Sequence, residues 1–397
     1  MRISRPQVYY LLTILFSVLF LGWGASVSIP GANLFRNEAE IVSIPCQVTE
    51  ITLDKTDMGE LGAGSGNYYL ERTLVFDGIA LSGEQKGQTI QAVQIIDNLS
   101  GAAVYPVEPG DKIFLYPLQE PSHGAMWQAG DYYRSPALGW LGALFLAGLI
   151  LFGRKKGVNT ILSLVFTCLA IFVVFVPAIL SGYNPYLVSL GICGFVIVMT
   201  LSLVSGFTLK SLASALGCAG GVLTAGLLTL LCTHLLKLTG MVDDTSVYVS
   251  LLNEDHPIDM LGILFAANII GAMGATMDVA MSISSSLHEL KEKAPGLGFG
   301  QLFASGVNIG RDIMGTMSNT LILAYIGSSL STVLLFASYQ SSLMQLLNRE
   351  AIVIEILQAL TGSIGILCTI PISACIASLL YRPLSAPAPA PEPAAKE

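Results

Sequence analysis

Long uninterrupted apolar runs alternate with short polar segments along most of the chain. Several windows of eighteen or more residues carry no charged side chain, and a helix needs about this length to cross roughly 30 Å of hydrocarbon. The pattern therefore predicts a mainly α-helical, polytopic transmembrane bundle of about eight spans. The predicted spans are 8–29, 136–152, 158–180, 186–208, 211–236, 258–286, 316–338 and 352–380.

The segment from 31 to 135 breaks this pattern. Its apolar residues are β-branched or aromatic, and they alternate or cluster between Gly, Asp and Asn turns, as they do in strands. We expect a small antiparallel β-barrel of about five strands, similar to an OB-fold. A binding or docking module and a rigid cap on the membrane part both remain open. The strand-like stretches are 42–53, 68–81, 86–96 and 111–118.

The positions of Lys and Arg predict how the chain crosses the membrane. Basic residues fall in alternate short loops, and such loops usually stay in the cytoplasm. Both termini are therefore predicted to be cytoplasmic, and the β-rich segment extracytoplasmic. Whether the first apolar segment is an uncleaved anchor or a cleaved signal peptide stays open. The predicted domains are 1–30 (N-terminal transmembrane anchor), 31–135 (β-rich), 136–382 (multi-span) and 383–397 (disordered Pro/Ala-rich tail).

Composition narrows the class of protein further. The chain is 53% hydrophobic and only 12% charged, whereas about a quarter of the residues in soluble domains are charged. Fourteen acidic against six basic residues in 31–135 give that segment a negative surface, which argues against a nucleic-acid partner. The sequence has no Walker A, HExxH or GxSxG motif and no metal-ligand spacing of His and Cys. We therefore expect no enzyme activity, cofactor or metal.

One acidic residue lies inside a predicted span. Asp278 is the only charged residue between Asp259 and His288. At about 100° per residue it shares a helix face of about 80° with small and polar residues. Such a face is either a helix-packing seam or the wall of a polar pathway, and the sequence leaves both open. The other members of the face are Gly271, Gly274, Ser282 and Ser285.

A second polar face occurs in GVNIGRDIMGTMSN, residues 306–319. As a helix it places Asn308, Arg311, Asp312, Gly315 and Asn319 within an arc of about 100°. Because buried charges need partners, we expect Arg311 to contact Asp278 near the inner leaflet. The candidate intramembrane polar site is Asp278, Arg311, Asp312, Asn308, Asn319 and Ser282.

Two neighbouring features carry weaker expectations. The Gly-rich stretch 297–315 is compatible with an interfacial helix, a re-entrant loop or the start of a broken span. Small residues recur every four positions along 213–225, which predicts close packing between helices. They are Ala213, Gly217, Gly221 and Ala225.

Several motifs together resemble the YibE/F-like family of bacterial membrane proteins, most closely its longer, YibE-like form. They are DYYR (131–134), SGYNP (181–185), MDVAMSISSSLHELKEK (277–293), NIGRDIMGTMSNTLILAYIGSSL (308–330) and TGSIGI (361–366). The resemblance implies a multi-pass protein of the plasma membrane and assigns no catalytic or binding residue. The Pro/Ala-rich tail departs from the family pattern.

Two functions fit these observations. The first is a transporter or permease component for a small solute or ion, with the candidate polar site lining or gating the path. The second is a non-transporting scaffold whose outer β domain docks an envelope protein. The lipid bilayer is the expected surrounding, and a second family member or a homo-oligomer is an open partner.

Overall fold

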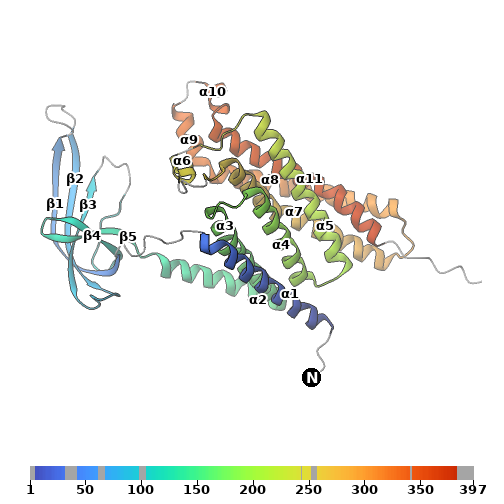
Figure 1. Cartoon of the computed structure of the whole chain (residues 1–397), viewed down its shortest axis with the longest axis horizontal. Coiled ribbons are helices and arrows are strands. Elements are labelled where there is room, and N and C mark those ends of the chain that lie inside the picture. Colours follow the sequence, from blue (N-terminus) through green and yellow to red (C-terminus); the bar gives the residue numbers. More distant parts are fainter. Residues whose placement is uncertain are drawn as a thin grey trace, which may run out of the picture. The chain divides into compact units, whose positions relative to one another are not determined.

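The computed structural model describes residues 5–31, 43–60, 68–97, 104–242, 244–251, 257–339 and 342–381. The chain divides into two compact units, Phe35–Gly148 and Met1–Leu34 with Leu149–Glu397 (Figure 1). It is mainly helical, with a small sheet near the N-terminus. The predicted tail, 383–397, lies outside the described residues.

Five strands form the sheet of the first unit. They pair in the order β1-β2-β3-β5-β4, and β4 pairs back with β1. Every pairing is antiparallel except that of β3 with β5. This corrects the all-antiparallel prediction, because strand directions cannot alternate all the way round a ring of five. The strands are β1 (Ile44–Glu60), β2 (Tyr68–Ala80), β3 (Thr89–Asp97), β4 (Lys112–Ser122) and β5 (Ala125–Tyr132).

Alternate residues of these strands fill the core of the sheet. Leu74 and Phe76 on β2 and Ile113 and Leu115 on β4 are fully buried, two residues apart as the pleat of a strand requires. Cys46 on β1 is equally buried. Strand β5 was not among the predicted stretches, because Gly, Gln and Asp interrupt its apolar residues.

Helices make up the second unit. Among the described residues, six segments are long and apolar enough to cross a membrane, and α8 with α9 forms a further pair bent by 60°. The longer helices are α1 (Arg5–Ser28), α2 (Ser135–Leu169), α4 (Pro185–Ser205), α5 (Leu209–Leu235), α7 (Met260–Lys293), α8 (Phe299–Ser328), α9 (Leu330–Tyr339) and α11 (Glu350–Leu380). The shorter ones are η1 (Ile29–Gly31), the π-helix η2 (Ala170–Phe175), α3 (Val176–Leu180), α6 (Asp244–Leu251) and α10 (Leu343–Leu347).

The helical segment from Ser135 to Leu180 is broken at Arg154. As one straight helix its 46 residues would measure about 69 Å, more than twice the hydrocarbon thickness. Arg154 has non-helical backbone angles, φ 48° and ψ −125°. Gly157 lies directly against the carbonyl of Leu149, although eight residues of unbroken helix would separate the two by about 12 Å. The chain therefore reverses direction at Arg154.

Small residues bring α5 and α11 into close contact. Gly217 lies against Ser373, and Gly221 lies against Thr369. One turn further along, Gly365 of α11 lies against Ala225. This confirms the predicted packing role of the small residues on α5. Helices α5, α7 and α11 run side by side, and α8 packs against α7 and α11 (Figure 1).

The stretch 297–315 begins a bent pair of helices that has the form of a broken span or a re-entrant loop, so both of these alternatives stay open. From Phe299 onward it is the first half of a continuous helix, α8. The break lies later, at Ser329, where the chain bends by 60° into α9. Gly306 and Gly310 hold the early part of α8 against Ala374 and Ile370 of α11, so this part belongs to the packed bundle.

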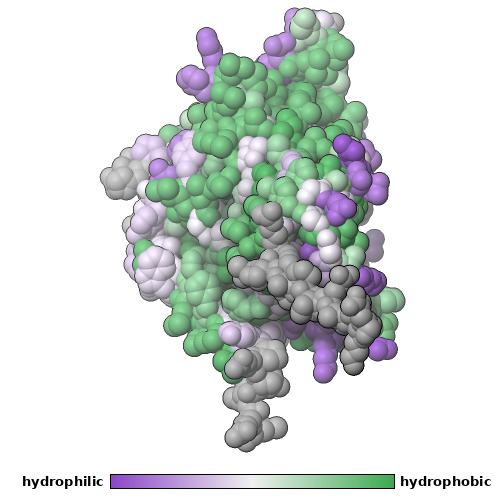
Figure 2. Space-filling view, turned by 90° about the vertical axis from the view of Figure 1, so that its right-hand side faces the viewer, coloured by the Kyte–Doolittle hydropathy of each residue, from purple (hydrophilic) through white to green (hydrophobic). Residues whose placement is uncertain are grey.

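Apolar side chains cover much of the outside of the bundle. Figure 2 shows one face on which hydrophobic residues predominate and hydrophilic residues form separate groups. Leu187, Leu227 and Leu235 are more than 60% exposed. Exposed apolar surface of this extent is typical of helices that face lipid.

Candidate functional site

Helix α7 has a buried face and an exposed polar face. Asp259 caps its N-terminus by accepting hydrogen bonds from the backbone N–H groups of Leu261 (3.0 Å) and Gly262 (3.2 Å). Its buried residues pack against α4, α5 and α11. The opposite face is exposed and carries small or polar residues. We call this face, made of Gly271, Gly274, Asp278 and Ser282, the α7 stripe.

Asp278 stands alone on the α7 stripe. It forms no hydrogen bond or ion pair with any residue that the structure describes, and its side chain is exposed. A Cβ built on Gly274, one turn away, would meet no atom within 4 Å. The described residues therefore leave the space beside Gly274 open.

Helix α8 also has two distinct faces. Its buried face packs through Gly306 and Gly310. At about 100° per residue the polar residues lie on the opposite side of the helix. All of them are exposed. We call this surface, made of Asn308, Arg311, Asp312, Gly315 and Asn319, the α8 polar face.

The predicted contact between Arg311 and Asp278 does not form. None of the five ion pairs among the described residues includes either side chain. Arg311 instead donates a long hydrogen bond from Nη1 to Asn308 Oδ1, at 3.4 Å. The prediction placed Arg311 on the wrong side of α8. Because α8 packs against the bundle through Gly306 and Gly310, Arg311 lies on the side that faces away from the bundle.

Asp278 and Arg311 nevertheless lie at a similar depth in the bundle. Gly362 of α11 lies against Leu321 of α8 and Ala272 of α7, so Leu321 and Ala272 are at about the same level. Because α7 and α8 are antiparallel, Asp278 is level with about Gly315, one helical turn from Arg311. The structure thus places all the predicted polar residues on α7 or α8, but on two separate faces.

Sequence reasoning missed a polar residue in the middle of the bundle. Asn268 of α7 is completely buried. Its Nδ2 donates to Oγ1 of Thr361 on α11, at 2.7 Å, and to Oγ1 of Thr229 on α5. Its Oδ1 has no hydrogen-bond partner among the described residues. The two predicted polar faces are centred on charged residues, and Asn268 lies on neither of them.

The first unit has a polar cavity of its own. Tyr105, Tyr132 and Arg134 line it together with residues of both charges, and its volume is about 600 Å³. Burial, followed by the nearby carboxylate of Asp111, raises the pKa of Tyr132. The protonated hydroxyl donates to the carbonyl of Tyr105 at 3.0 Å. The remaining lining residues are Pro106, Glu108, Asp111, Lys112, Tyr133 and Ala137.

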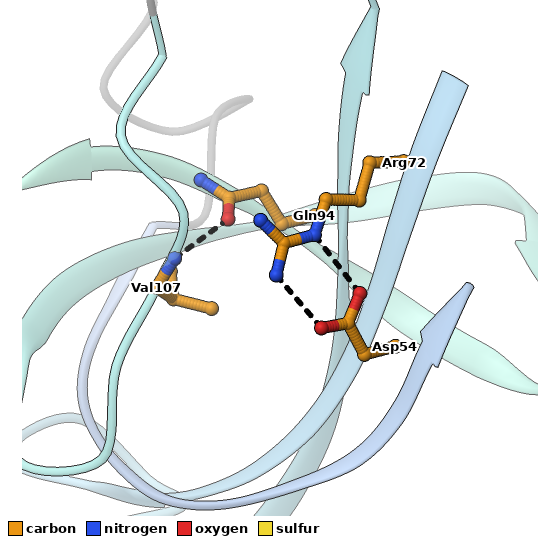
Figure 3. A network of polar contacts seen from close by, with 4 residues as sticks. All are labelled: Asp54, Arg72, Gln94 and Val107. Atoms are coloured by element: carbon orange, nitrogen blue, oxygen red, sulfur yellow. Dashed lines mark hydrogen bonds and ion pairs between the residues drawn. The ribbon is translucent and has the colours of Figure 1, made fainter. Parts of the chain in front are cut away.

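Gln94 fixes the wall of this cavity. Its Oε1 accepts a hydrogen bond from the backbone N–H of Val107 at 2.8 Å (Figure 3). Its Nε2 donates to the carbonyl of Tyr105 at 3.0 Å. A bidentate ion pair between Arg72 and Asp54 joins β2 to β1 in the same sheet, with N–O distances of 2.9 and 2.7 Å (Figure 3). In the described part of the chain no three His, Cys, Asp or Glu side chains are arranged to hold a metal.

The sequence of the helical unit matches one family model. That model, described as YibE/F-like protein, covers residues 141–383, which is more than half of the chain. The chain belongs to the YibE/F-like family. The family match includes the α7 stripe, the α8 polar face and Asn268, whereas the strands β1 to β5 precede it. No curated protein and no solved structure matches the chain.

Two of the motifs that carry the family resemblance have a visible structural use. In SGYNP, Asn184 caps α4 by accepting from the backbone N–H of Tyr186 at 3.0 Å, and Pro185 begins the helix. Ser181 of the same motif donates to the carbonyl of Ser28, at the end of α1, at 2.6 Å. In TGSIGI, Thr361 binds Asn268. These motifs of the YibE/F-like chain hold helices together, and they do not surround Asp278.

Proposed function

We propose that the protein is a transporter or permease component of the plasma membrane, and that it moves a small cation along the α7 stripe. The observation that supports this is the unpaired, exposed carboxylate of Asp278 on a helix long enough to cross the membrane. In this proposal the chain crosses the membrane eight times, since the reversal at Arg154 divides one helical segment into two spans.

The free-energy cost of placing a carboxylate in lipid favours an α7 stripe that faces water. A carboxylate at the centre of a lipid-facing helix costs about 2.5 to 3.5 kcal/mol on insertion scales, so intramembrane acids usually face a protein interior or water. The described protein residues give Asp278 no partner. Water and a passing cation would satisfy it, and Gly274 would leave room for both beside the helix.

The charge of the stripe favours a cation as the substrate class. Asp278 is its only ionisable group, and Ser282, one turn along, adds a hydroxyl oxygen. Carboxylate and hydroxyl oxygens are the ligands preferred by hard cations. An anion would meet only repulsion from Asp278.

Cation uptake by the purified full-length chain in liposomes tests this function. Uptake of radioactive sodium, radioactive rubidium and protons is measured separately, the last with an enclosed pH-sensitive dye. We expect at least one cation to enter faster than into protein-free liposomes, and Asp278→Asn to slow it about tenfold or more. Glu292→Gln, at the exposed end of the same helix, is the matched control and should not change the rate. Uptake no faster than in empty liposomes for all three cations would reject the proposal.

The cavity of the first unit favours a second candidate function, a scaffold that docks an envelope protein. Three tyrosines beside charges of both signs are typical of a surface that binds a peptide segment. A photo-crosslinking residue at Tyr105 of the full-length chain in native membranes tests it. We expect a cross-linked partner that Arg134→Ala reduces. Capture that is the same with and without this substitution argues against a partner held in the cavity.

A further inference from the structure

The α8 polar face points away from the bundle that the rest of α8 packs against. Measured around the helix from the midpoint of Gly306 and Gly310, Asn308 and Gly315 lie about 160° to 180° away. Arg311 and Asp312 flank them on the two sides, at about 120° and about 140°. The face is therefore polar along its centre and carries one charge of each sign at its edges.

The charges of this face lie within the bundle's length rather than at its end. Gly310 is in contact with Ile370 of α11, and α11 continues for ten more residues, to Leu380. Arg311 is therefore about 15 Å along the helix axis from the inner end of α11. Both charges therefore lie within the helical bundle, away from the ends of α8 and α11.

The residues that the structure describes leave these charges unsatisfied. Within the described ranges Asp312 has no hydrogen bond or ion pair, and Arg311 has only its long hydrogen bond to Asn308. A charged side chain within a span is expected to pair with another group or to contact water. A further protein surface that brings an acid to Arg311 and a base to Asp312 would satisfy both.

We infer that the α8 polar face binds the same face of a second copy of this chain. In a pair of parallel helices related by a two-fold axis along the membrane normal, one flank of each helix faces the opposite flank of the other. Arg311 then faces Asp312 of the partner subunit, and Asp312 faces Arg311 of the partner subunit. The two residues differ by only about 1.5 Å in height, so both ion pairs form at one level.

Small side chains at the centre of the face allow this approach. A Cβ built on Gly315 would meet no atom within 4 Å, and Ala304, near the centre of the same face, is exposed. Small residues at a helix interface in a membrane let the two backbones come close together. Asn308 and Asn319 are polar groups that can form hydrogen bonds across the same contact. The inference concerns assembly and does not depend on whether the α7 stripe conducts cations.

Charge exchange in the full-length chain tests the two-fold arrangement. The dimer fraction in liposomes is measured by single-molecule photobleaching of a fluorescent label, at a series of protein-to-lipid ratios. The single variants Arg311→Asp and Asp312→Arg each place like charges opposite one another, so we expect each to lower the dimer fraction about tenfold. The double variant restores opposite charges on both sides and should recover the dimer.

A matched exchange elsewhere and a cross-link complete the test. Exchanging Glu289 and Lys293, an exposed ion pair on α7 with an N–O distance of 2.7 Å, should leave the dimer fraction unchanged. Gly315→Cys, in a chain without the other cysteines, should form an intermolecular disulfide on oxidation.

Several results would overturn the inference. They are a wild-type chain that stays monomeric at every ratio, single variants that dimerise normally, and a double variant that fails to recover although it elutes as folded protein. If the Gly315→Cys variant reacts with a water-soluble maleimide but never cross-links, water covers the face. A disulfide formed only with a different polypeptide would assign the face to that partner.

Discussion

The contact between α5 and α11 offers a quantitative test of the packing. In the variant Gly221→Ala the new methyl group would fall on Oγ1 of Thr369 and 3.0 Å from the carbonyl oxygen of Gly365. Thr369 cannot easily turn away, because its hydroxyl donates to that carbonyl at 2.8 Å and its β-branched side chain has few rotamers in a helix.

Two opposing effects set the expected size of the change. Adding a methyl group to a close-packed site costs about 1 to 3 kcal/mol. Replacing Gly by Ala inside a helix stabilises the helix by up to about 1 kcal/mol. We therefore expect Gly221→Ala to lose about 1 to 2 kcal/mol of unfolding free energy. Gly194→Ala in α4, where a Cβ meets no atom within 4 Å, is the matched control and should be neutral or slightly stabilising.

A double variant separates steric overlap from other causes. Thr369→Ala removes the oxygen that the new methyl group would meet. The combined variant with Gly221→Ala should therefore lose less stability than the two single losses added together, by about 1 kcal/mol. Unfolding free energies are measured by titrating the folded chain in mixed micelles with a denaturing detergent. Equal stability of Gly221→Ala and Gly194→Ala, or strict additivity in the double variant, would refute the close contact.

Three further predictions concern other parts of the molecule. Asn268→Leu should lower the unfolding free energy by about 1 to 2 kcal/mol in the same titration, since two interhelical hydrogen bonds of about 0.6 kcal/mol each are lost; no loss would mean that they do not form. Burial raises the pKa of Cys46 to about 11, so the folded chain should resist alkylation there at pH 8 until it is denatured, and rapid labelling of the native chain would contradict this. The hydrogen bond from Arg72 lowers the pKa of Asp54 below its ordinary value of 3.8. The ion pair should therefore stabilise the sheet fully at a pH above that value, and its contribution should disappear as the pH falls below it. Asp54→Asn should lower the stability at pH 7 and not at pH 2, and an equal loss of stability at both pH values would contradict the pairing.

The helical pattern was readable from the sequence because membrane helices must satisfy their backbone internally and be apolar over a fixed length. The small residues of α5 were also informative, since small residues repeated every four positions are typical of close contact between helices. The sequence could not reveal that Ser329, rather than the Gly-rich stretch before Arg311, is where the chain bends. Glycines such as Gly306 and Gly310 serve packing here, and packing glycines look the same in sequence as flexible ones.

The candidate site was only partly predictable. The wheel positions of Asp278, Arg311 and Asp312 identified two polar faces, both of which are exposed in the structure. A wheel does not show how two helices turn toward each other, and the expected ion pair failed for that reason. Asn268 forms a fully buried polar contact between helices, yet its single uncharged side chain gives little sequence signal.

Water accessibility along α7 decides whether the stripe can carry a cation. Single cysteines at 271, 274, 278 and 282, on the α7 stripe, and at the buried positions 272, 276 and 280 are introduced into a chain without other cysteines. Each variant in sealed liposomes is treated with a water-soluble maleimide that does not cross membranes. We predict rapid labelling of the four stripe positions and slow labelling of the three buried ones. If all seven positions stay unlabelled until the protein is denatured, Asp278 faces lipid or protein, and the α7 stripe is not a path for cations.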